Sequence, residues 1–286
     1  MTSLLDQDLS WLMLGGLIAT IFSWIASRNG YYWLPQQGSG VGVPLPLKYV
    51  AGAFGLFFFI EMMIVPEFFT SWRVFTEQTE GEPSVQQKIV LDMIGALSTL
   101  LILVWFYGVL PANCRRQILC TKEHFQWIID PLMGIVTWVI AYPWVFVVSQ
   151  IMQVILLFIH GPVTIDQIAV ERVKAVADDP LMLALVTLFV ILIVPMIEEL
   201  LFRGFLQTYL KQVFGRSLAI VLTSIIFAGF HFADKQGFEN LMILGALFVL
   251  SCYLGFIRER QQSLLAPIAL HGTFNAVTIL IIKITP

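Results

Sequence analysis

The stretch LMLALVTLFVILIVPMIEELLFR, residues 181–203, decides the class of fold. It begins with an apolar run from Leu181 to Ile197 and then places two adjacent glutamates, Glu198 and Glu199, directly after that run. A helix needs about 20 mostly apolar residues to cross the hydrocarbon core of a membrane. The run therefore predicts a membrane-spanning helix, and the two carboxylates at its end require an explanation.

The whole chain has the composition of a membrane protein. Of its 286 residues, 58% are hydrophobic and 12% are charged, against about 45–50% apolar and about 25% charged in soluble domains. Apolar runs recur along its entire length, so we expect an all-α, multi-pass transmembrane helical bundle of about eight spans. The expected spans are Trp11–Ser27, Tyr49–Phe69, Ile89–Leu110, Pro131–Ile159, Leu181–Ile197 with a continuation, Ser217–Phe232, Leu241–Ile257 and Leu264–Ile282. The continuation, Glu198–Val213, either extends the fifth span or forms a separate interfacial helix.

Charge and cysteine content limit the expected partners and sites and predict the orientation of the chain in the membrane. The net charge of −3, without a basic run, excludes nucleic acid as an expected partner. The three cysteines form no C-x-x-C pair, so neither a disulfide framework nor a cysteine metal site is expected. Loops after the first, third, fifth and seventh spans hold ten of the 16 Lys and Arg residues, which predicts that these loops face the cytoplasm. The compact chain favours the bacterial inner membrane.

Polar groups that converge in apolar surroundings lie only in the last third of the chain. They fall between Glu198 and Asn275, so we divide the chain functionally at about residue 180. Residues 1–180 are predicted to form an N-terminal transmembrane scaffold of about four spans, and residues 181–286 a transmembrane domain that carries the chemistry.

The first polar cluster is EELLFR. Ionisable groups inside a bilayer usually pair, face a wet cavity or do chemistry. In a helix, Glu199 and Arg203 lie four residues apart on one face and can form an ion pair. At about 100° per residue, Glu198 points roughly 140° away from Arg203 and lacks a local partner. The alternative is that both glutamates only cap the membrane exit at the headgroups.

Two further clusters contain imidazole and amide groups. FAGFH places His231 near the end of an apolar run, where a packed or interfacial histidine is the alternative to a functional one. HGTFN places His271 and Asn275 four residues apart on one helix face. A polar contact between helices is the alternative interpretation of that pair.

Taken together, the three clusters supply the groups needed to hydrolyse an amide. A carboxylate can take a proton from water, two imidazoles can orient the water or bind a metal, and an amide N–H can face the developing oxyanion. Glu199 would then fix Arg203, while Glu198 is left to act as the base. Glu61 and Asp92, within the second and third spans, lack such companions and are interpreted as packed, protonated or water-cavity residues.

The order EELLFR, FAGFH, HGTFN resembles the E-E-x-x-x-R, F-x-x-x-H and H-x-x-x-N motifs of the CPBP intramembrane proteases, also called the Abi or CAAX-protease-and-bacteriocin-processing family, which includes the Rce1-type CAAX prenyl endopeptidase. All three motifs match, and the resemblance covers about Leu181 to Ile282. It implies an α-helical endopeptidase with its active site inside the membrane.

The resemblance also implies a role for each matched residue. Glu198 is the water-activating glutamate with His231 beside it, His271 and Asn275 bind the oxyanion, and Glu199 and Arg203 support them. We expect no cofactor. A divalent metal such as zinc, held by Glu198, His231 and His271, is the alternative.

The expected partners are the lipid bilayer and a peptide or protein substrate, with or without a lipid. Two other functions stay open. The same buried groups suit a proton or ion pathway in a transporter, and they also suit a non-catalytic immunity or scaffold protein.

Overall fold

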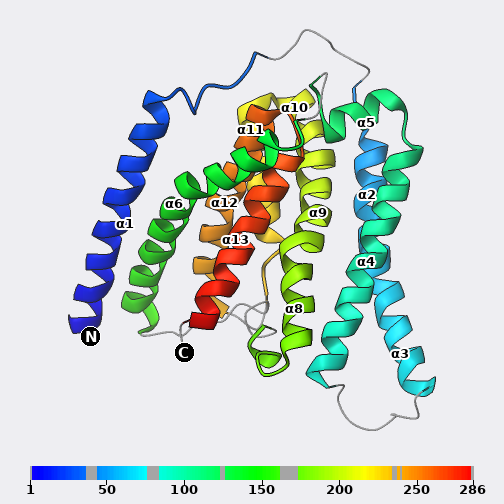
Figure 1. The fold of residues 1–286 in the computed structure, drawn as a ribbon, viewed down its shortest axis with the longest axis horizontal. Helices are drawn as coiled ribbons and strands as arrows, with labels where there is room; N and C mark the ends of the chain where they lie inside the picture. Colours follow the sequence, from blue (N-terminus) through cyan, green and yellow to red (C-terminus); the bar gives the residue numbers. More distant parts are fainter. Residues whose placement is uncertain are drawn as a thin grey trace. The chain divides into compact units, whose positions relative to one another are not determined.

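The computed structural model describes residues 2–36, 44–75, 84–122, 126–161, 173–233, 237–238 and 240–284. Its regular elements are helices, apart from an isolated bridge between Cys120 and Ser263. The helices are α1 (Thr2–Arg28), α2 (Leu47–Phe59), η1 (Ile60–Ile64), α3 (Val65–Phe75), α4 (Val85–Val109), α5 (Ala112–Leu119), α6 (Ile129–His160), α8 (Pro180–Leu188), η2 (Phe189–Ile193), α9 (Val194–Glu199), η3 (Leu200–Leu206), α10 (Gln207–Phe214), α11 (Arg216–Gly229), α12 (Asn240–Gln261) and α13 (Leu265–Ile284). Figure 1 shows their arrangement. The expected all-α multi-pass bundle is confirmed.

Seven helices in the described part of the chain are long and apolar enough to cross a membrane. The structure differs from the expected eight spans at α11, which has only 14 residues. At 1.5 Å per residue such a helix is about 21 Å long, shorter than the hydrocarbon core of about 30 Å. Glu198–Val213 is not a separate interfacial helix, because helical structure runs without a break through the 35 residues Pro180–Phe214.

Large apolar side chains on the outer helix faces fit a lipid environment. Leu17 and Trp24 on α1 are 59% and 60% exposed, and Leu101 on α4 is 62% exposed. In water, contiguous apolar surfaces of this kind lead to association, whereas lipid tails solvate them.

The chain folds into two compact units, each assembled from three separate segments. The first unit comprises Met1–Val41, Cys120–Ile165 and Leu210–Leu270, and the second comprises Gly42–Leu119, Asp166–Tyr209 and His271–Pro286. Each unit thus combines segments from both sides of residue 180. The functional division at residue 180 stays a prediction, because it concerns where the chemistry lies.

In the first unit, α6 packs against both α1 and α12, and α12 packs against α11. Polar side chains join α6 to the N-terminal segment. The Tyr31 hydroxyl donates to Thr137 Oγ1 at 2.7 Å, and Trp144 Nε1 donates to Ser23 Oγ at 2.7 Å. Such bonds satisfy polar groups that would otherwise be costly to bury.

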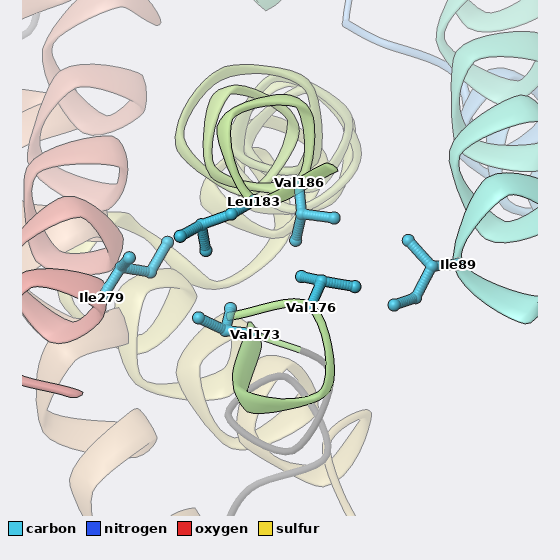
Figure 2. Close-up of a cluster of buried hydrophobic side chains, with 6 residues drawn as sticks. All are labelled: Ile89, Val173, Val176, Leu183, Val186 and Ile279. Atoms are coloured by element: carbon cyan, nitrogen blue, oxygen red, sulfur yellow. The ribbon is translucent and has the colours of Figure 1, made fainter. Parts of the chain in front are cut away.

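In the second unit, α4 packs against α2, α3 and α9. An apolar cluster joins α8 to α4 and α13, and Figure 2 shows its side chains directed toward a common centre. The cluster consists of Ile89, Val173, Val176, Leu183, Val186 and Ile279, all at most 7% exposed. It packs the segment that leads to Glu198 and Glu199 against neighbouring helices.

Three helical segments, η1, η2 and η3, have π-helical hydrogen bonding. In η2 the Val194 N–H donates to Phe189 O, and after η3 the Gln207 N–H donates to Phe202 O, both five residues back. Single π turns inside α-helices occur frequently at functional sites. Here η2 and η3 flank α9, the six-residue segment that ends with the two glutamates.

The first unit predicts a packing-sensitive glycine on α6. A Cβ added to Gly134 would lie 2.2 Å from Ala266 O and 2.9 Å from Leu270 N on α13. We expect Gly134→Ala to destabilise the protein by about 1–3 kcal/mol, because these backbone atoms must move apart. Thermal unfolding of the detergent-solubilised protein measures the effect.

Gly16 on α1 provides the matched control. A Cβ at Gly16 meets nothing within 4 Å, so Gly16→Ala should keep or raise the melting temperature, as alanine favours helix over glycine. Equal melting temperatures for the two alanine variants would contradict the close packing of α6 and α13 at Gly134.

Candidate active site

Glu198 and Glu199 end α9 and differ in burial. The side chain of Glu199 has an exposed fraction of 0%, whereas that of Glu198 is 22% exposed. A fully buried carboxylate cannot serve as a headgroup cap, so that interpretation does not hold for Glu199. The two adjacent residues therefore occupy different environments within one helix.

The ion pair expected within EELLFR is present. Arg203 Nη1 donates to Glu199 Oε1 at 2.9 Å, and both side chains are 0% exposed. Buried charges are tolerated when they are paired and hydrogen-bonded. The Thr208 hydroxyl donates to the carbonyl oxygen of Arg203 at 3.2 Å, which helps to satisfy the backbone inside the π-helical segment η3.

His271 on α13 contacts both glutamates through its two ring nitrogens. Nδ1 lies 2.9 Å from Glu199 Oε1, and Nε2 lies 3.8 Å from Glu198 Oε2. The same oxygen of Glu199 accepts from Arg203, so a single carboxylate oxygen joins the guanidinium to the imidazole. With Glu199 ionised, Nδ1 carries a proton and donates, and Nε2 is the nitrogen that faces Glu198.

Asn275 lies one turn after His271 and contacts the backbone of η2. Its Nδ2 donates to Val190 O at 2.9 Å. An amide nitrogen has two hydrogens, so this bond uses one of them. Asn275 therefore holds α13 against the helix that carries the glutamates.

His231 belongs to the first unit, whereas the other five predicted site residues belong to the second. His231 follows the end of α11, and its Nδ1 donates to Phe227 O at 2.9 Å. In the neutral ring this places the proton on Nδ1 and leaves Nε2 as the acceptor nitrogen. The Asn240 side chain bonds Ala233 and Gly237, which ties the turn beyond His231 to the start of α12.

Of the three residues in the metal alternative, His231 lies in the first unit, and Glu198 and His271 lie in the second. No three His, Cys, Asp or Glu side chains in the described part of the chain are grouped as ligands for an ion. Zinc sites use three or four such side chains around one ion. The metal alternative stays a prediction.

The acidic residue of the second span, Glu61, is hydrogen-bonded to the third span. Glu61 lies in η1, and its Oε1 accepts from Thr99 Oγ1 on α4 at 2.8 Å. Asp92 is half-buried on α4. Sequence patterns had separated these residues from the candidate site, and Glu61 fits the packed interpretation.

The Glu199–Arg203 pair predicts a large stability effect. We expect Arg203→Met to destabilise the protein by about 3–5 kcal/mol, because it leaves the buried Glu199 without its cation. Adding Glu199→Gln should recover part of that loss, since the double variant no longer buries an uncompensated charge. Thermal unfolding in detergent compares the variants, and an unchanged melting temperature for Arg203→Met would contradict the pairing.

Comparisons with known proteins identify the segment that contains these residues. Residues 180–277 match the family model described as type II CAAX prenyl endopeptidase Rce1-like. The comparisons with curated proteins and with solved structures found no match. The matched segment includes all six predicted site residues and leaves residues 1–179 outside it.

The family match and the seven apolar helices agree with the resemblance inferred from the three motifs. The protein is an integral, multi-pass membrane protein, and the match supports a CAAX-protease-like function that acts on a peptide or protein. Through residues 180–277 the chain is similar to the Rce1-like family of type II CAAX prenyl endopeptidases.

Proposed function

We propose that the protein is an endopeptidase that hydrolyses a peptide bond at membrane depth with a water activated by Glu198. The proposal rests on one observation: Glu198 Oε2 and His271 Nε2 face each other and lie 3.8 Å apart. This separation exceeds a direct hydrogen bond, and a water beside the pair, rather than between the two atoms, can bond both. The side chain of Glu198 is 22% exposed, while Oε2, the oxygen that faces His271, is buried. We propose that water reaches this carboxylate from its exposed side.

Hydrolysis by this route needs only proton transfers to and from Glu198. The carboxylate takes a proton from the water, and the resulting hydroxide bonds to the carbonyl carbon of the scissile peptide. The carbonyl π electrons move to oxygen and form the oxyanion. When the C–N bond breaks, Glu198 returns the proton to the leaving nitrogen, which yields a carboxyl terminus and an amine.

His271 and Asn275 are the proposed donors to the oxyanion. Nδ1 of His271 already donates to Glu199, so donation from Nε2 requires the ring to act as an imidazolium in that step. Asn275 has a second amide hydrogen beside the one bonded to Val190 O. Preorganised donors of this kind stabilise developing negative charge strongly in a site that excludes water.

Glu199, Arg203 and His231 are assigned supporting roles. Glu199 and Arg203 hold His271 through the shared carboxylate oxygen. His231 is proposed to orient the attacking water through Nε2, on the basis of its motif and the Nδ1 bond to Phe227 O. We assign the base to a carboxylate and route no step through a metal, which stays the alternative.

A lipidated peptide is the substrate class that this proposal favours. A prenyl chain can occupy the bilayer while the adjacent peptide reaches a site at membrane depth. We also propose the bacterial inner membrane as the location. Residues 1–180 would then serve as the scaffold and the route of substrate access.

Glu198→Gln is expected to lower the rate of cleavage of a prenylated CAAX peptide by about 10²–10⁴-fold, the usual contribution of a general base. Glutamine keeps the size of the side chain but cannot take a proton, so the melting temperature should change little. Purified protein in detergent or nanodiscs is assayed for released C-terminal peptide.

The exposed Glu67 on α3 gives a matched control. Glu67→Gln should cleave at the wild-type rate. Wild-type cleavage by Glu198→Gln would show that another group acts as the base. Proton flux into liposomes that is lost in Glu198→Gln, without peptidase activity in the wild type, would favour the transport alternative.

Chelation distinguishes the glutamate mechanism from the metal alternative. We expect cleavage to remain within about twofold of the untreated rate after incubation with a strong chelator and removal of the chelate, because the mechanism uses side chains alone. Metal analysis of the same sample by mass spectrometry provides the second measurement. Loss of activity that returns on adding zinc would instead assign a metal to Glu198, His231 and His271.

A further inference from the structure

The backbone bond made by Asn275 requires an open carbonyl inside a helix. In a helix, the carbonyl of each residue is normally occupied by the N–H of the residue four positions later, or five positions later in a π segment. Val190 lies in the middle of η2, yet its carbonyl accepts from the side chain of Asn275 at 2.9 Å. The local sequence must explain why this acceptor is open to α13.

Pro195 supplies that explanation. The Val194 N–H donates to Phe189 O, five residues back. The next N–H in the same register, that of residue 195, would reach Val190 O. Residue 195 is a buried proline, which has no N–H. Val190 O can accept from the N–H of residue 194 in α-helical register or from that of residue 195 in π-helical register. The first N–H donates to Phe189 O instead, and proline lacks the second.

The neighbouring carbonyl shows the same relation to α13. In α-helical register, the N–H of residue 195 would reach Ile191 O instead. A Cβ added to Gly272 on α13 would lie 2.6 Å from that oxygen. Pro195 therefore supplies no N–H to the carbonyls of Val190 and Ile191. These are the two carbonyls that α13 approaches, the first through Asn275 and the second through Gly272.

We propose that Pro195 is a positioning residue. Because it has no N–H, the Val190 carbonyl is left to accept the hydrogen bond from Asn275, and this bond fixes the position of α13. His271 precedes Asn275 by one helical turn and contacts both glutamates. The hydrogen bond between Asn275 and Val190 thus fixes the distance between the proposed base and the proposed oxyanion donors. The catalytic consequence rests on the proposed function, whereas the coupling of Pro195 to Asn275 does not.

A double-mutant cycle tests this coupling through stability. Asn275→Leu alone should lower the melting temperature, because the Val190 carbonyl loses its donor while it stays within the helix bundle. Pro195→Ala supplies an N–H to that carbonyl, and alanine favours the helix. Pro195→Ala should therefore keep or raise the melting temperature, and in its presence the loss caused by Asn275→Leu should fall to less than half.

Pro143, inside α6 of the first unit, is the matched control. Pro143→Ala should leave the effect of Asn275→Leu unchanged. Additive effects of Pro195→Ala and Asn275→Leu would overturn the proposal. If Pro195→Ala does not yield folded protein, Pro195→Ser restores the same N–H and completes the same cycle.

Cleavage provides the second readout. Pro195→Ala should lower kcat at least tenfold with little change in KM, in a protein at least as heat-stable as the wild type. A proline with only a structural role would instead lose activity together with stability or lose neither. Absence of cleavage in the wild type would count against the proposed function, and the stability cycle would still decide the role of Pro195.

Discussion

A charged carboxylate deep in an apolar helix bundle must be compensated, and the Glu199–Arg203 pair meets this requirement on a single helix face. Both side chains are fully buried and lie 2.9 Å apart. The carboxylate oxygen that accepts from Arg203 also lies 2.9 Å from His271 Nδ1. One oxygen therefore compensates the guanidinium and orients the imidazole. The position of His271 depends on this buried carboxylate together with the bond of Asn275 to Val190 O, one turn further along the same helix.

The backbone of the long helix Pro180–Phe214 contributes as much as its side chains. Two π segments flank the six residues that end with the glutamates. Each π segment alters which carbonyls are occupied by N–H groups, and side chains bond two of the carbonyls within them: Asn275 bonds Val190 O, and Thr208 bonds Arg203 O. Irregular backbone is tolerated at membrane depth where neighbouring groups satisfy it. The helix thus gains specific attachment points without losing its continuity.

Local sequence predicted those features that depend on local spacing. Long apolar runs identified the spanning helices, and the separation of four residues identified the Glu199–Arg203 pair. The structure differs from the expected spans at α11, which is too short to span. Of the two interpretations of Glu198–Val213, the continuation of the preceding helix is confirmed. The contact of His271 with Glu199 joins residues 72 positions apart, and Asn275 bonds a residue 85 positions away. Periodicity carries no information about such contacts. The π segments also escaped prediction, although the proline at position 195 is a signal that could have indicated η2.

The adjacent glutamates also bear on how one residue type can take two roles. An anchoring carboxylate has to be shielded from water, because water would compete for the hydrogen bonds it makes to Arg203 and His271. A base has to exchange protons with water, and so needs some exposure. Glu199, with no exposed surface, meets the first requirement, and Glu198, 22% exposed, meets the second. On the proposed mechanism, burial rather than residue type separates the anchor from the base. The imidazole between them explains why the two must be neighbours, since its two nitrogens face the two carboxylates from opposite sides of one ring.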